Sequence, residues 1–139
     1  MFFSTDSAAP EVVADAFVRG EDRRQLSLTH YRGTWVVLAF GVRRFDAIEL
    51  AELEDAFGAD GAIVLAATSH DWHDTAERYA DTPVRFPMLV DVDEHRRITV
   101  IVDPGGVVRH IGLRRSARET LATLEALVAP RSRTLRRAA

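Results

Sequence analysis

Two groups of side chains in this 139-residue chain have the types and spacing that acid–base chemistry needs. Asp46 and Glu49 lie three residues apart, and His70 and His73 flank Asp71 and Trp72 in a short polar run. A histidine beside a carboxylate can move a proton. The chain contains no cysteine, and all 18 of its Lys and Arg residues are arginine. Thiolate chemistry, lysine Schiff bases and lysine general bases are therefore excluded.

Both groups also have structural interpretations, and we favour these. An acidic residue at a helix N-cap followed by Glu three residues later is a capping box, which would explain Asp46 and Glu49 without any substrate. His70 and His73, with nearby acids, could bind zinc or iron. Two histidines alone rarely suffice for a metal site, so we interpret them as solvated residues at a helix start and predict no metal and no cofactor.

The remaining aromatic and imidazole groups are less informative. Trp72 is a candidate to stack on a ligand, whereas Trp35 begins an apolar run and is expected to pack in the core. His30, His95 and His110 have no partner at a meaningful spacing, and we expect them to be ordinary surface groups.

Strand and helix signals alternate along the chain. The apolar runs at 35–40 and 62–67 predict central parallel strands buried on both faces. Helices are predicted at 46–57, at 71–80 and from Ser116 onward, where Ser116 and Glu119 form a capping box. A short strand is predicted at 88–90, and a hairpin at 97–102 and 107–111. This order is typical of an α/β thioredoxin-like fold, with a central mixed β-sheet flanked by helices.

Composition indicates one domain over residues 1–139, because 47% of the residues are apolar and a chain of this length can bury a core without disulfides. Residues 1–10 and 130–139 are expected to be loosely ordered ends. A net charge of −3 argues against nucleic acid and anionic membrane as partners. The sequence has no apolar run of roughly 18 residues, the minimum for a membrane span, so we expect a soluble, cytoplasmic protein.

Several segments together resemble one protein family. They are Leu26-Ser27-Leu28, Tyr31-Arg32-Gly33, Trp35 to Leu38 with Phe40, Phe86-Pro87, Arg97 to Pro104 and Gly106 to His110. In order and spacing this set resembles the peroxiredoxins of the alkyl hydroperoxide reductase type, over about residues 17–128. The resemblance implies a thioredoxin-like fold and a homodimer.

The resemblance fails at the residues that carry the family's reaction. The family's active-site motif, Pro-x-x-x-Thr-x-x-Cys, falls on Val42, Asp46 and Glu49, so all three signature residues are replaced. The family's peroxide-orienting arginine is matched by Arg97. The family also has a longer segment before this arginine than residues 92–96 provide, which implies that the pocket wall is shorter on that side.

The resemblance then implies that Asp46, Glu49 and Arg97 converge at a helix N-terminus, which favours anions. Glu49 would pair with Arg97 or accept a proton, and His70 or His73 would face Glu49 across the pocket. We therefore predict Glu49, Asp46, Arg97, His70 and His73 as catalytic residues. Arg97, Trp72 and Val42 are predicted to bind substrate.

Two functions follow from these residues. The leading hypothesis is a repurposed pocket that binds, and transforms, a small anionic or oxygenated organic molecule by thiol-independent acid–base chemistry. The alternative is a non-catalytic scaffold or partner subunit that uses the sheet edge and helix faces for association. The sequence does not specify the substrate or the reaction.

Overall fold

The computed structural model describes residues 3–114 and 116–138, apart from the side chains of 130–138. Its described part contains a seven-stranded sheet with strand order β2-β1-β5-β4-β3-β6-β7. Parallel pairs join β3 to β4 and β4 to β5, and the other neighbouring strands are antiparallel. The strands are β1 Val13–Phe17, β2 Arg24–Ser27, β3 Trp35–Ala39, β4 Ala62–Ala67, β5 Met88–Leu89, β6 Ile98–Val102 and β7 Val108–Leu113.

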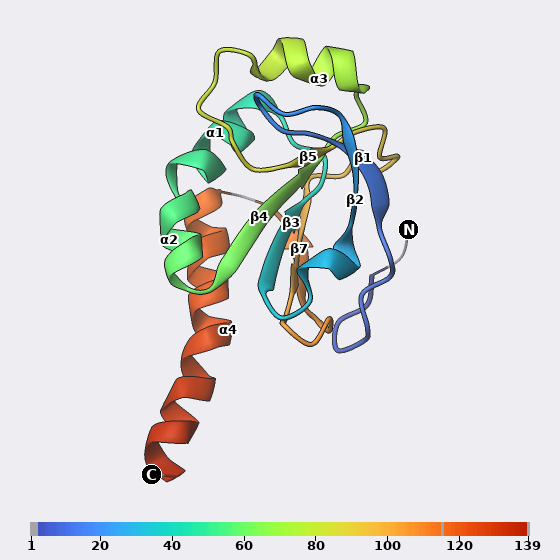
Figure 1. The fold of residues 1–139 in the computed structure, drawn as a ribbon. Coiled ribbons are helices and arrows are strands. Elements are labelled where there is room, and N and C mark those ends of the chain that lie inside the picture. The colour runs from blue at the N-terminus through green and yellow to red at the C-terminus, as the bar shows by residue number, and fades with distance from the viewer. Residues whose placement is uncertain (1–2, 115, 139) are drawn as a thin grey trace.

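Helices cover one face of this sheet, and side chains from the β1–β2 end of the same sheet pack against the other face of β3. The helices are α1 Arg44–Glu52, α2 Glu54–Ala59, α3 Trp72–Tyr79 and α4 Ala117–Ala138, with a 3-10 turn at Leu28–Tyr31. Figure 1 shows α1, α2 and α4 together on one side, the β1–β2 hairpin on the opposite side, and α3 above the sheet.

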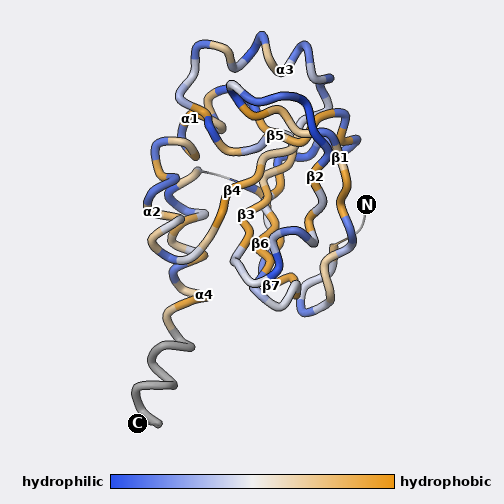
Figure 2. Tube along the Cα trace, in the orientation of Figure 1, coloured by the Kyte–Doolittle hydropathy of each residue, from blue (hydrophilic) through white to orange (hydrophobic). Residues whose placement is uncertain are grey.

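The core has two layers because the central strands alternate side chains between the two faces of the sheet. Val37 and Ala39 of β3 join the layer beneath the helices. Val36 and Leu38 join the layer beneath the β1–β2 hairpin. Both layers are buried, so β3 and β4 are continuously apolar (Figure 2). The α/β thioredoxin-like class predicted from the sequence is confirmed, as are the two central parallel strands.

The predicted helix at 46–57 is wrong in its start and in its continuity. The structure begins α1 at Arg44 and interrupts the helix at Leu53, where the backbone has φ −104° and ψ 6°. Two short helices, α1 and α2, therefore replace one. The earlier start changes the site. Asp46 was expected at the N-cap of the helix, and it is instead the third residue of α1.

The loose order expected of residues 1–10 and 130–139 stays a prediction, and the structure gives the following contacts near the two ends. Near the N-terminus, the amide of Asp6 donates to the carbonyl of Val108 at 2.7 Å, and that of Ala9 donates to Gly106 at 2.8 Å. These bonds attach the first residues to the β6–β7 hairpin. At the other end, α4 extends to Ala138. Among the helices of the described residues, none has the length and apolar character to cross a membrane.

Candidate functional site

A buried carboxylate lies at the centre of the region that the sequence singled out. The side chain of Asp46 is 3% exposed. Its Oδ1 accepts a hydrogen bond from Nη2 of Arg97 at 2.6 Å, and its Oδ2 accepts from Nη2 of Arg114 at 3.2 Å and from the backbone N–H of Arg43 at 3.1 Å. We call Asp46, Arg97 and Arg114 the Asp46 cluster.

Three elements bring the Asp46 cluster together. Asp46 is the third residue of α1, which starts just beyond the end of β3. Arg97 immediately precedes β6 and Arg114 immediately follows β7. The hairpin places the two arginines side by side, and the amide of Arg114 donates to the carbonyl of Arg97 at 2.8 Å.

Arg114 was not identified by sequence reasoning. Its side chain is only 1% exposed, and its Nη1 donates to the carbonyls of Phe40 at 2.9 Å and Ile98 at 3.2 Å. Burial lowers the pKa of this guanidinium, against the opposing effect of Asp46. An irregularity in the pairing between Ile101 and Val102 shifts the register of the hairpin so that Leu113 lies opposite Ile98, and no local pattern in the sequence placed Arg114 beside Arg97.

The partners of Asp46 favour its ionised form. Burial alone would raise the pKa of its carboxyl. The hydrogen bonds from Arg97, the Arg43 amide and Arg114 outweigh this effect and hold the pKa below its ordinary value. Asp46 therefore fixes the start of α1 and the two arginines in place.

The predicted capping box and the predicted partner of Arg97 are both corrected. Arg43 is the N-cap of α1, and Asp46 receives the Arg43 amide. A capping box also needs the N-cap side chain to accept a hydrogen bond from the backbone N–H of Asp46, and an arginine side chain has no acceptor. Glu49 is half-buried one turn later, and no ion pair between described residues involves it. Arg97 pairs with Asp46 instead, because the helix starts earlier than expected.

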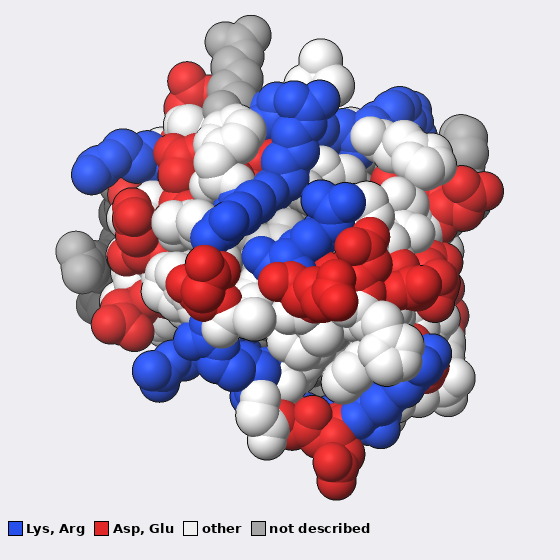
Figure 3. Space-filling model, turned by 90° about the horizontal axis from the view of Figure 1, so that it is seen from above, with Lys and Arg blue, Asp and Glu red and all other residues white. Residues whose placement is uncertain are grey.

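A cavity of about 270 Å³ lies beside the Asp46 cluster. It is found where β3 and β4 end, beneath α3. Two residues predicted from the sequence, Val42 and His70, line it. Its lining is Val42, Arg43, Arg44, His70, Arg78 and Tyr79, and we call it the arginine-lined cavity. Figure 3 looks down on this end of the molecule and shows basic side chains gathered across it, with acidic side chains beside them.

The guanidiniums around this cavity differ in their partners. Arg44 pairs with Asp81 at 3.0 Å, and Arg78 pairs with Asp74 at 3.2 Å. Asp74 also contacts Nδ1 of His70 at 2.9 Å. Among the described residues, no carboxylate pairs with Arg43 within salt-bridge distance. The cavity therefore offers one guanidinium that is free to bind a ligand and an imidazole oriented by a carboxylate.

The other predicted site residues lie outside this lining. Trp72 packs edge-on against Phe17, with ring centroids 5.6 Å apart. His73 is exposed, and its ring centroid lies 5.7 Å from that of Trp72. Within the described part of the chain, no group of three or more His, Asp or Glu side chains gathers as a metal site would require.

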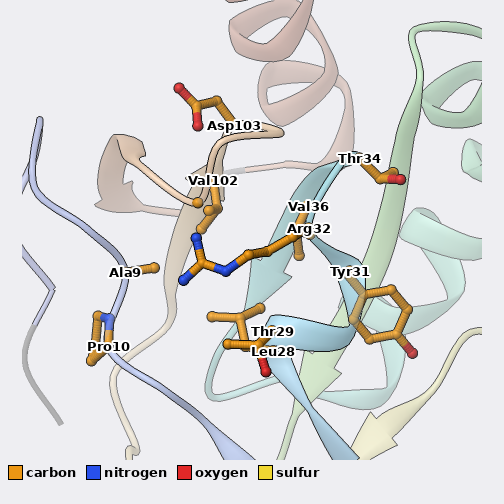
Figure 4. Close-up of a pocket in the computed structure, with 11 residues that line it drawn as sticks. Ala9, Pro10, Leu28, Thr29, Tyr31, Arg32, Thr34, Val36, Val102 and Asp103 are labelled. Atoms are coloured by element: carbon orange, nitrogen blue, oxygen red, sulfur yellow. The ribbon is translucent and has the colours of Figure 1, made fainter.

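Two other hollows do not bring the predicted residues together. The one in Figure 4 lies where Ala9 and Pro10 pass Arg32 and Val102, and its volume of about 20 Å³ leaves room for a single water. Another, of about 450 Å³, lies at the opposite end of β4 and is bordered by Glu54.

Comparisons with known proteins find this fold among solved structures. No family model matches the sequence, and no curated protein matches it. The reduced 2-Cys peroxiredoxin of Plasmodium vivax is similar at 20% identity and a TM-score of 0.80, over 88% of this chain and 95% of that one. AhpC of Enterococcus faecalis is 18% identical, with a TM-score of 0.79 over 90% and 92% of the two chains. AhpC of Mycobacterium bovis is 19% identical, with a TM-score of 0.79 over 94% and 96%. This protein therefore has the thioredoxin-like fold of the 2-Cys peroxiredoxins and AhpC proteins without a single cysteine.

Proposed function

We propose that this protein binds a small organic anion in the arginine-lined cavity. The observation that carries the proposal is the group of three arginines around a cavity of about 270 Å³, one of which has no carboxylate partner among the described residues. A guanidinium binds carboxylate or phosphate oxygens through two parallel N–H groups. The volume suits a molecule smaller than most drug-sized ligands. Thiol peroxidase chemistry is closed because no thiolate exists.

We further propose that His70 acts on the bound anion as a general acid or base. Asp74 contacts Nδ1 of His70, which orients the ring and leaves Nε2 as the nitrogen able to exchange a proton with a ligand. Asp46 and Arg97 are positioning residues in this proposal, because Asp46 holds the Arg43 amide. The catalytic roles first predicted for Glu49 and His73 stay predictions, as does ligand stacking by Trp72.

The proposal is tested by the affinity of purified protein for small carboxylates and organic phosphates, measured by isothermal titration calorimetry. Arg43→Ala is expected to weaken the best-bound anion by about 10- to 100-fold, the value of one hydrogen bond to a charged group. Arg23→Ala is the matched control, because Arg23 is an arginine on the β1–β2 hairpin that pairs with Asp15. It should leave the affinity unchanged.

The outcomes separate binding from catalysis. If no anion in the panel binds, or if Arg43→Ala and Arg23→Ala behave alike, the cavity is not the binding site. Once an anion is found, His70→Gln should reduce its turnover while leaving its dissociation constant within about twofold. Equal turnover in wild type and His70→Gln would contradict the acid–base role.

A second candidate function is association between two copies of the chain through β7. This strand is at the end of the sheet, and an edge strand offers unpaired backbone groups to a partner. Leu113, its last residue, is 78% exposed. A twofold pairing of β7 with its copy would bury Leu113 and extend the sheet.

Sedimentation velocity tests this association. Leu113→Asp should raise the dimer dissociation constant at least about tenfold, because it places a charge where an apolar side chain would be buried. Val13→Asp replaces another exposed apolar residue, 52% exposed and located on β1, and should leave the dissociation constant unchanged. A wild-type monomer at high concentration would contradict the proposal. The cytoplasmic location and the lack of a nucleic-acid partner stay predictions from the sequence.

A further inference from the structure

The arginine-lined cavity receives hydrogen-bond donors from two separate helices. Arg43 and Arg44 lie at the start of α1, and Arg78 and Tyr79 are the last two residues of α3. The side chains of Arg44 and Arg78 are 57% and 52% exposed, and Arg43 is exposed as well. Among the described residues that line the cavity, none is acidic. A ligand can therefore reach all three guanidiniums without meeting a carboxylate in the lining.

The ion pairs of these arginines leave most of their nitrogens unused. Arg44 donates through Nη2 to Asp81, and Arg78 donates through Nε to Asp74. Nε and Nη1 of Arg44 and both Nη atoms of Arg78 have no partner in the described part of the chain. The Arg43 guanidinium has no carboxylate partner there either. Because a guanidinium carries five N–H donors, the cavity offers many more donors than the protein itself uses.

Tyr79 adds an uncharged donor to the same cavity. It is 3% exposed. Outside the helix, the hydrogen bonds that described residues make with Tyr79 go to its backbone carbonyl, so its hydroxyl has no partner among them. The hydroxyl oxygen is accessible, unlike that of Thr75 on the same helix, which is sealed. Burial raises the pKa of the Tyr79 phenol, although Arg78 and Arg44 oppose this effect. The hydroxyl therefore keeps its proton at neutral pH and can donate to an anion.

The charges around the cavity favour an anion with two negative charges. Arg44 and Arg78 are each matched by one carboxylate outside the lining, whereas Arg43 is not. The Asp46 cluster beside the cavity holds two guanidiniums and one carboxylate. One positive charge is thus unmatched in each place. A dianion gains attraction from both, and a monoanion can balance only one of them.

A phosphate monoester meets these requirements better than a carboxylate does. Its phosphate group carries close to two negative charges above pH 7 and has three strong acceptor oxygens that point in different directions. Such a group can accept from donors on α1 and on α3 together. A carboxylate has only two oxygens, which lie in one plane. The volume of about 270 Å³ corresponds to roughly nine water molecules, which leaves room for a phosphate group and a short organic group.

We infer that the arginine-lined cavity binds a phosphate monoester with a short organic group. The phosphate oxygens accept from Arg43, Arg78 and the hydroxyl of Tyr79, and the organic group lies against the apolar side chain of Val42. This inference rests on the proposed function, because it specifies the class of anion that the same cavity takes. It involves no bond-forming step.

Three probes test the class of anion, and isothermal titration calorimetry at pH 8 measures their affinities for the full-length protein. Propyl phosphate is the dianionic monoester. Methyl propyl phosphate keeps the phosphate but carries one charge, and glutarate carries two charges without a phosphate. Propyl phosphate should bind at least about tenfold more tightly than either of the others. If methyl propyl phosphate or glutarate binds as tightly, the inference is overturned and the proposed anion site survives. If neither these probes nor any other carboxylate or phosphate binds, both fail.

Tyr79→Phe is the central variant, because it removes only the unpaired hydroxyl. It should weaken propyl phosphate about tenfold, the value of one hydrogen bond to a charged group. Tyr31→Phe is the matched control, since Tyr31 is a half-buried tyrosine that borders the separate hollow at the other end of β4. It should leave the affinity unchanged. Wild-type affinity in Tyr79→Phe would overturn the inference. Tight binding of propyl phosphate that Arg43→Ala does not weaken would place the phosphate elsewhere and overturn both the inference and the proposed site.

Discussion

Replacing Asp46 with asparagine is expected to lower the free energy of unfolding by about 3–5 kcal/mol, the usual cost of removing one partner from a buried ion pair. The carboxylate accepts from Arg97, Arg114 and the Arg43 amide. Asparagine has almost the same shape but no charge, so it would leave two buried or half-buried guanidiniums without an anion. Urea denaturation at pH 7 measures the difference.

The control for this prediction is an aspartate that also pairs with arginine but at the surface. Asp81 contacts Arg44 at 3.0 Å with its side chain 76% exposed. Surface ion pairs contribute at most about 1 kcal/mol, so Asp81→Asn should be nearly neutral. If both variants lose a similar free energy of unfolding, the burial of Asp46 does not increase the contribution of its ion pairs to stability.

The pH dependence of stability gives an independent check on the same residue. The pKa of Asp46 is lowered in the folded protein, so its contribution is fully present above the unfolded pKa, about 3.9, and is lost as the pH falls through the folded value. The difference in stability between wild type and Asp46→Asn should therefore narrow below about pH 4. A difference that stays constant from pH 7 to pH 3 would contradict the role assigned to the ionised carboxylate.

Much of the fold could be predicted because burial leaves a simple pattern in the sequence. Strands β3 and β4 are buried on both faces, so they read as unbroken apolar runs, and the β6–β7 hairpin is marked by its Pro-Gly-Gly turn. The β1–β2 hairpin was missed because it is short and partly exposed, with a polar β2. Its strands are recognisable only from their pairing with each other and with β5.

The sequence predicted the position of the carboxylate that pairs with Arg97 to within about one helical turn. The sequence placed a carboxylate from the start of α1 beside Arg97, and the structure confirms such a pair. The carboxylate is Asp46 and not Glu49, because the helix begins at Arg44. Arg114 lies outside any local pattern, since its partners come from distant segments of the chain. Arg43 and Arg78 join His70 only through the packing of α3 over the ends of β3 and β4.

Gly41 joins the end of β3 to the cavity-lining loop, and replacing it with alanine should destabilise the protein by about 3 kcal/mol. Its φ of +61° is unfavourable for any residue with a Cβ. A Cβ at this position would also lie 2.6 Å from the carbonyl oxygen of Arg96 and 2.8 Å from that of His95. Both are backbone atoms, which cannot rotate away as a flexible side chain would, so strain of about 1–3 kcal/mol is added to the conformational cost.

Gly20 provides the matched control for Gly41. It also has a positive φ, +78°, but no atom lies within 4 Å of its hypothetical Cβ. Gly20→Ala should therefore show the conformational cost alone, about 1–2 kcal/mol, and the difference between the two variants in urea denaturation isolates the contact with residues 95 and 96. Because Arg97 follows directly, that contact fixes the segment carrying the guanidinium that meets Asp46. Equal losses in Gly41→Ala and Gly20→Ala would show that the close approach does not constrain the site.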